Sequence, residues 1–174
     1  MTTLYPPAPT WAIRAAHLVA LTALPSGLWR LALAMGYHAG HTEQGYVDRV
    51  GSTTGAIYVV VLSIVAEGFA LLSLGLVRPW GEVVPRWIPL LGGRAIPPKA
   101  VVVSASVGAT ILFVLWTPFL LWWNIPDVTL TATGHTVVGF LYLPLVAWAP
   151  LLAAITLDFH RRHRPLPAVL LIES

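Results

Sequence analysis

The sequence predicts an all-α fold, a polytopic membrane four-helix bundle, and three observations lead to this prediction. Hydrophobic residues make up 57% of the 174 residues and charged residues only 10%, whereas a soluble domain averages roughly 25% charged residues. Four apolar stretches each reach the ~20 residues that a helix needs to cross a bilayer. Basic residues are also distributed very unevenly between the two ends of these stretches, as is typical of membrane proteins.

The four predicted spans cover residues 11–36, 53–77, 99–123 and 135–159. They account for most of the chain, so residues 1–174 are predicted to form a single transmembrane domain. Small residues recur within the spans, and such residues let neighbouring helices approach closely. Proline inside a span removes a backbone donor and predicts a kink. The prolines inside the spans are Pro25, Pro118, Pro144 and Pro150.

Outside the spans, the charges predict which side faces the cytoplasm. With four spans, one side holds a single basic residue, Arg49, beside Glu43, Asp48 and Asp127. Lys and Arg are enriched in cytoplasmic loops, so the other side is predicted to be cytoplasmic. Both termini and the connection 78–98 then lie in the cytoplasm, and the protein is a multi-pass protein of the inner (plasma) membrane. The basic residues of that side are Arg14, Arg78, Arg86, Arg94, Lys99, Arg161, Arg162 and Arg164.

The connection 78–98 is apolar but rich in proline, so it is predicted to fold against the cytoplasmic interface without forming a long helix. Two interpretations stay open for it. It is either a lid, in which Glu82 closes a cavity below Glu67, or an interfacial anchor in which Trp80 sits at the headgroup level.

Glu67 is the candidate for chemistry, because it lies near the middle of the second apolar span. A charged side chain there costs on the order of 3 kcal/mol on insertion scales, and such residues usually face a partner or a cavity. Helical spacing puts Glu67 on one face with Ser63 and Ala70, and burial favours the neutral acid. The carboxyl is then either a proton donor or a helix–helix hydrogen-bonding group.

Arg30 is a second charge inside a span, near its predicted outer end. Straight helices place it at a different depth from Glu67, so Asp127 or Glu43 is expected to be an easier partner. The alternative is an arginine that extends to the outer headgroups over Trp29.

Aromatic residues are abundant, with eight tryptophans, and most of them are explained by interface belts or by core packing. Aromatic faces around a buried acid also suit a cationic intermediate, which they stabilise by ~1 to 2 kcal/mol where water is excluded. The candidate substrate-binding residues are Tyr58, Trp116, Tyr142, Phe113, Trp29 and Trp80.

Several classes of site are excluded or disfavoured. The chain has no cysteine, which excludes disulfide chemistry and thiolate-bound metals. His38, His41 and His135 are predicted near the outer edge, but no ligand spacing on one helix supports a metal site. No cofactor is expected, since no dinucleotide or phosphate-loop motif occurs. The basic residues lie at span ends, which indicates no nucleic-acid partner.

The segments 25–30 (PSGLWR) and 78–89 (RPWGEVVPRWIP) resemble those of small four-span membrane proteins that are common in actinobacteria and mostly of unknown function. The size, the cysteine-free aromatic bundle and the buried acid are similar, as an analogy of parts, to membrane-bound terpenoid cyclases. That similarity implies protonation of a polyene by a carboxylic acid.

The leading functional hypothesis is therefore a membrane enzyme that acts on a prenylated, hydrophobic small molecule taken from the lipid bilayer. Glu67 is its general acid, with Glu82 or Arg30 assisting. The alternatives are a small proton-coupled transporter and an accessory membrane subunit without chemistry. The sequence leaves the oligomeric state open, and a homo-oligomer is one of the alternatives.

Overall fold

The computed structural model describes residues 6–83 and 92–164, and for Pro79 and Glu82 it describes the backbone only. The helices are α1 (Thr10–Ala34), α2 (Glu43–Val50), α3 (Thr53–Leu72), α4 (Pro98–Trp116), α5 (Ala132–Tyr142) and α6 (Trp148–Arg162). Short 3₁₀ segments follow them: η1 (Ser73–Leu76), η2 (Pro79–Glu82), η3 (Thr117–Asn124) and η4 (Leu143–Ala147). The all-α prediction is confirmed.

Four continuous helical stretches are long and apolar enough to cross a membrane, and they match the predicted spans. They are Thr10–Ala34, Thr53–Leu76, Pro98–Asn124 and Ala132–Arg162. Pro118 and Pro144 each lie at the second position of a 3₁₀ segment, η3 or η4, where the α-helix is interrupted, and a kink follows Pro118 at Leu121. Pro25, by contrast, lies inside the unbroken helix α1.

The sequence reasoning missed the short helix α2, which lies in the connection between the first two spans. Its signals are present in the sequence: Thr42 caps the helix by accepting a hydrogen bond from the backbone N–H of Gly45, Glu43 lies in the first turn and Arg49 in the last. These are the positions at which helix caps and the helix dipole favour such residues.

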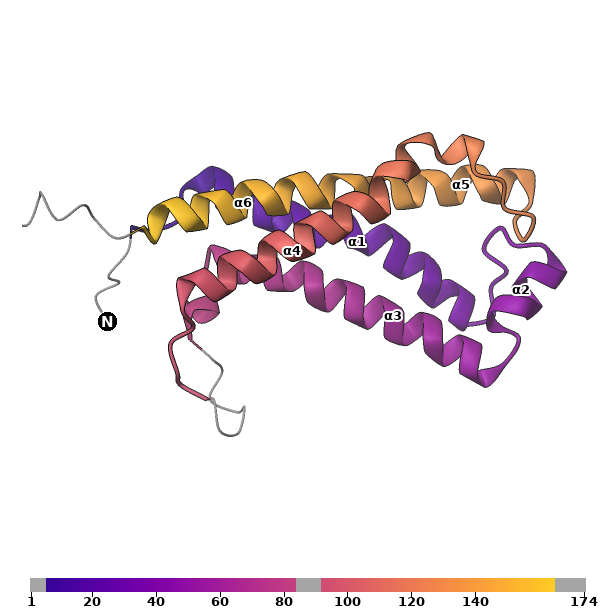
Figure 1. Cartoon of the computed structure of the whole chain (residues 1–174). Coiled ribbons are helices and arrows are strands. Elements are labelled where there is room, and N and C mark those ends of the chain that lie inside the picture. Colours follow the sequence, from indigo (N-terminus) through magenta and orange to yellow (C-terminus); the bar gives the residue numbers. More distant parts are fainter. Residues whose placement is uncertain (1–5, 84–91, 165–174) are drawn as a thin grey trace, which may run out of the picture.

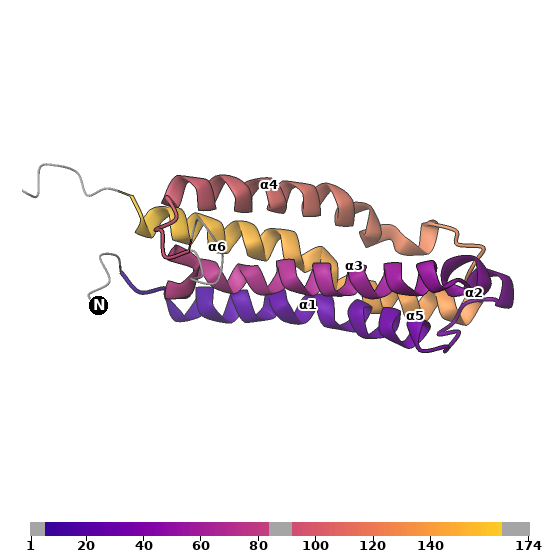
Figure 2. The same ribbon diagram turned by 90° about the horizontal axis from the view of Figure 1, so that it is seen from below.

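The spans pack as an open row, with α3 on α1, α1 on α6 and α6 on α4. Figure 2 shows α4 and α3 on opposite sides of α6. The consecutive helices α3 and α4 make hardly any contact within the described part of the chain. This arrangement is more open than the compact bundle that the sequence predicts.

Helix α1 is one of the two inner helices of the row. In its most apolar stretch of 18 residues, 50% of the stretch is buried inside the molecule. In the span that contains α4, the corresponding share is only 6%. Small residues on one face of α1, including Ala12, Ala16 and Ala23, are fully buried, and such residues let neighbouring helices approach closely. The exposed surface of α3 and α4 is mostly Val, Ile, Leu and Phe, the composition that a lipid environment favours.

The start of α1, the connection from α3 to α4 and the end of α6 lie at the same end of the molecule (Figure 1). At this end Arg162 donates from Nε to Asp158 at 2.8 Å and from Nη2 to the carbonyl of Leu76 at 2.9 Å. Asp158 and Arg162 form an ion pair within α6, and the hydrogen bond from Arg162 to Leu76 ties α6 to the end of the second span.

At the opposite end, two loops are joined through their backbones. The N–H of Thr42 donates to the carbonyl of Thr129, and the N–H of Thr131 donates to the carbonyl of Gly40. The backbones approach closely at Gly40 and Gly134, where a Cβ built on Gly40 would lie 2.6 Å from the Cα of Gly134. Glycine is required there, and Gly40 also has a φ of 92°.

Candidate functional site

The contact between α1 and α3 positions the candidate acid. The helices lie side by side (Figure 2), and Gly27 of α1 faces Glu67 of α3. A Cβ built on Gly27 would lie 3.2 Å from Oε1 of Glu67. The missing side chain of Gly27 therefore makes room for the carboxyl group between the two helices.

One oxygen of the Glu67 carboxyl lacks a hydrogen-bond donor in the described part of the chain. Oε1 is buried and has no hydrogen-bond partner among the described residues. The neighbours on its face, Ser63 and Ala70, are buried, as helical spacing predicted. A buried carboxylate without a donor is costly, and its neutral form costs far less. The interface therefore holds a carboxyl oxygen that meets no donor among the described residues.

Glu67 lines a cavity of about 390 Å³ between α1 and α3. Its walls are almost entirely aliphatic: Leu24, Leu28 and Leu31 of α1, and Ile64 and Leu71 of α3, with Gly27, Gly68 and Ser63 between them. Several of these leucines are exposed at the outer surface of the helix pair. The cavity is therefore a lateral groove with one acidic group in it, which we call the Glu67 groove.

Arg30 lies one turn along α1 from Gly27 and is buried, with 7% of its surface exposed. It donates from Nε to Ser63 Oγ at 2.9 Å and from Nη1 to the hydroxyl of Tyr142 at 3.1 Å. Its guanidinium carbon also lies 5.7 Å from the centre of the Tyr142 ring, within the range of cation–π attraction.

Two expectations for Arg30 were wrong. Its hydrogen-bonding partners are not Asp127 or Glu43, because Asp127 pairs with Arg49 at 3.9 Å and Glu43 with His38 at 3.0 Å. Its burial also excludes extension to the outer headgroups. The register of α1 against α3 places Arg30 opposite Ser63, which is one turn from Glu67. The side chains of Arg30 and Glu67 therefore lie closer in depth than the sequence predicted for two straight helices.

Tyr142 is the centre of an aromatic cluster beside Arg30. The ring centres of Trp29, Trp116 and Phe119 lie 5.7, 6.0 and 5.9 Å from that of Tyr142. The sequence reasoning included the first two and missed Phe119. The spacing of three residues from Trp116 was the available signal, since such residues share a helix face.

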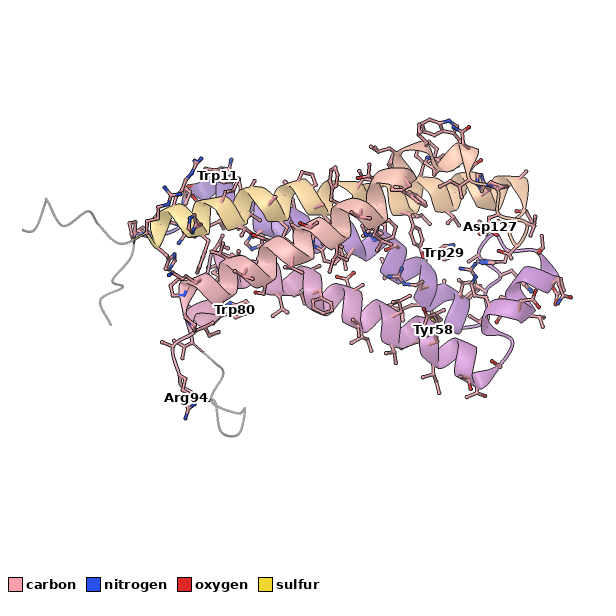
Figure 3. All side chains as sticks on the ribbon, viewed as in Figure 1. Trp11, Trp29, Tyr58, Trp80, Arg94 and Asp127 are labelled. Carbon is pink, nitrogen blue, oxygen red and sulfur yellow. The ribbon has the colours of Figure 1, made fainter. Side chains whose placement is uncertain are left out.

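The other candidate substrate residues lie away from this cluster. Tyr58 and Phe113 are 63% and 59% exposed on the outer faces of α3 and α4. Trp80 contacts Gly75 at the end that carries the termini, far from Trp29 (Figure 3). The side chain of Glu82 lies outside the described residues, as do residues 84–91 of the connection that was predicted to be a lid or an anchor.

The loops at the end opposite the termini hold a cluster of polar side chains, which includes His41 and Asp127. Trp29 packs against this cluster. His41 is buried, stacks on Trp29 with ring centres 5.2 Å apart, and has no described hydrogen-bond partner for Nε2. Burial, together with the charge of Arg49, lowers the pKa of His41. Burial alone would raise the pKa of Asp127, but two hydrogen bonds from Thr129 and the charge of Arg49 outweigh it and lower that pKa.

The lowered pKa of His41 predicts a loss of stability in mild acid. The folded state prefers the neutral imidazole, so this contribution is complete above the unfolded pKa of 6.5 and is lost as the pH falls through the lower folded pKa. We expect the melting temperature in detergent to fall between about pH 7 and pH 5. His41→Phe, which keeps a ring against Trp29, should flatten this dependence.

His160→Gln is the control for this experiment. His160 lies near the end of α6, at the end of the molecule that carries the termini, so its substitution should leave the pH profile unchanged. An unaltered profile in His41→Phe would show that the dependence does not come from His41 and would contradict this prediction.

No group of three or more His, Asp or Glu side chains in the described part of the chain is arranged to hold a metal ion. His135, from the outer trio, instead packs on Trp122 with ring centres 5.2 Å apart and bonds through Nε2 to the carbonyl of Ile125 at 2.8 Å. Comparisons with protein-family models, with curated proteins and with solved structures find no match for this chain.

Proposed function

We propose that the protein is an integral membrane enzyme that binds a prenylated, lipophilic small molecule in the Glu67 groove and protonates it from Glu67. The reaction class is a proton-initiated isomerisation or cyclisation of terpenoid type. The observation that supports this most is the carboxyl of Glu67, which has a buried, unpartnered oxygen and lines an aliphatic groove of about 390 Å³.

The proposed placement is in the plasma membrane, with both termini in the cytoplasm. It is supported by four spans of sufficient length and by the position of the basic connection at the same end as the termini. The groove would then open sideways into the hydrocarbon region, so a lipophilic substrate enters from the bilayer without crossing water.

The chemistry needs no cofactor. The carboxyl proton of Glu67 moves to one carbon of a substrate alkene, forming a C–H bond and leaving a carbocation and a carboxylate. Attack by a second alkene forms a C–C bond and moves the positive charge. Loss of a proton from the adjacent carbon to the carboxylate restores the acid, so the product is an isomer of the substrate. The carboxyl proton exchanges with solvent before the next turnover.

The aromatic residues set a requirement on the substrate. Rings stabilise a cation when they lie within about 6 Å of it, but the lining of the Glu67 groove is aliphatic. The cluster around Tyr142 lies beyond Ser63, next to Arg30. A substrate that uses these rings must extend from the groove past Ser63, with its cation kept away from the guanidinium.

The lining of the groove also favours this proposal over a transporter of polar solutes. Glu67 and Ser63 are the polar side chains that line it, and the remaining walls are Leu, Ile and Gly. Moving a hydrated solute along such walls requires removal of its water without replacement by protein donors or acceptors, which is costly.

Solvent isotope labelling tests the proposal. The purified protein, in lipid nanodiscs prepared in D₂O, is incubated with farnesylated and geranylgeranylated phenols, and the products are examined by mass spectrometry. We expect a cyclic isomer that carries one solvent deuteron at the protonated carbon. A product without solvent deuterium, or no product from any member of the panel, would contradict proton-initiated chemistry on prenylated phenols.

A further inference from the structure

A second groove lies on the surface of the molecule, between α4 and α6, and none of the chemistry above uses it. Its cavity has a volume of about 520 Å³. The small buried side chains of Ala109 and Ala149 contribute to its floor, and the exposed side chains of Phe113 and Leu157 form part of its walls. We call it the α4–α6 groove.

The α4–α6 groove presents an apolar surface although it contains hydroxyl groups. Thr110 donates to the carbonyl of Ser106 at 2.9 Å, and Thr156 donates to the carbonyl of Leu152 at 2.7 Å. Both threonines therefore satisfy their own helix and offer methyl groups to a ligand. A hydrocarbon chain loses no hydrogen bond by lying against them.

The length of the groove corresponds to one leaflet of a bilayer. Its lining residues on α4 run from Val102 to Phe113, which is about 16 Å along a helix axis. The hydrocarbon core of a bilayer is about 30 Å thick. The groove thus extends from one end of the spans to about the middle of the core.

One end of the groove is basic. Lys99 lies one turn before Val102 on the same face of α4, and His160, which lines the groove, lies on the corresponding end of α6. Arg164 follows one turn later, and its Nε lies 3.4 Å from Nε2 of His160. The opposite end, at Phe113 and Ala149, is apolar. The groove is therefore amphiphilic along its length.

We propose that the α4–α6 groove binds an anionic phospholipid, with one acyl chain along the groove and the phosphate at Lys99, His160 and Arg164. Inside the bilayer an acyl chain is held in such a groove by van der Waals packing, because lipid tails and apolar side chains are equally apolar, and Lys and Arg bind phosphate through charge-assisted hydrogen bonds. This site rests on the membrane placement of the spans and not on the chemistry of Glu67.

The same charges argue against a second copy of the chain as the occupant. Copies inserted in the same orientation and related by a two-fold axis along the membrane normal would meet at equal depths. Lys99 and Arg164 of one copy would then lie against their equivalents in the other, and like charges repel. A lipid phosphate instead complements them.

The experiment measures lipid association directly. The full chain is reconstituted in phosphatidylcholine vesicles with trace spin-labelled phosphatidylglycerol or spin-labelled phosphatidylcholine, and the motionally restricted fraction of each label is measured. We expect phosphatidylglycerol to associate several-fold more strongly. The double variant Lys99→Gln/Arg164→Gln should remove this preference, and Ala153→Phe, which fills the groove, should lower the restricted fraction of both lipids.

The matched control is Arg94→Gln/Arg161→Gln, which removes two charges from the same end of the molecule but outside the groove. If this control lowers the preference equally, the attraction is a general surface potential and the site is overturned. Added inorganic phosphate at constant ionic strength should leave the restricted fraction unchanged. Its displacement of the lipid label would instead indicate a phosphate site without a chain site and would also overturn the proposal.

Discussion

Glu67→Gln should abolish product formation from a prenylated substrate, with a loss on the order of 10²- to 10⁴-fold, the usual contribution of a general acid. Glutamine has nearly the same shape but has no acidic proton to transfer. Because Oε1 of Glu67 makes no hydrogen bond with the described residues, we expect little change in the melting temperature. Turnover by mass spectrometry and unfolding in detergent would be measured on the same preparation.

The control for this experiment is Glu43→Gln, which neutralises an exposed acid at the end opposite the termini and should leave turnover unchanged. Unchanged turnover in Glu67→Gln would remove Glu67 from the mechanism. A variant that only melts at a lower temperature would show that the carboxyl serves helix association, as in an accessory subunit. A pH-dependent flux in proteoliposomes that is lost in Glu67→Gln would favour the transporter.

Gly134→Ala should cause a large loss of stability although it adds only a single methyl group. A Cβ on Gly134 would overlap the backbone of Gly40, which cannot rotate away as a side chain can. Overpacking usually costs about 1 to 3 kcal/mol, and a clash between two backbones should reach or exceed the upper value. Since Gly40 and Thr131 are also hydrogen-bonded there, the two loops at the end opposite the termini should separate.

Gly108→Ala is the matched control, because this glycine lies inside helix α4 with open space around its Cα. It should stabilise the protein slightly, since alanine is the better helix former. Thermal unfolding in detergent would measure both variants. Equal melting temperatures for Gly134→Ala and the unsubstituted protein would show that the loops are not held by this contact.

The sequence predicted the elements well because their signals are local. Apolar length defines the four spans, and the prolines at 118 and 144 locate two interruptions. Helical spacing alone placed Ser63 and Ala70 on the same face as Glu67, and both are buried. These properties depend on residues within a few turns of each other, so no tertiary information was needed.

The partners of the polar residues were not predictable in the same way. Whether Arg30 meets Ser63 or Asp127 depends on the register of α1 against α3, which small residues such as Gly27 set through close packing. The grouping of Trp116 and Phe119 around Tyr142 depends on how η3 and η4 turn after their prolines. Each choice involves helices that are distant in the sequence.

By itself, the sequence determined that this chain forms apolar helices of membrane-spanning length and that one of them carries an isolated acid, because composition and helical period are properties of single segments. Only the tertiary structure decided that this acid lies in an aliphatic groove against Gly27, that Arg30 and the aromatic rings gather one turn away, and that α3 and α4 remain apart. Those features arise from the packing of surfaces between helices, which no single segment encodes.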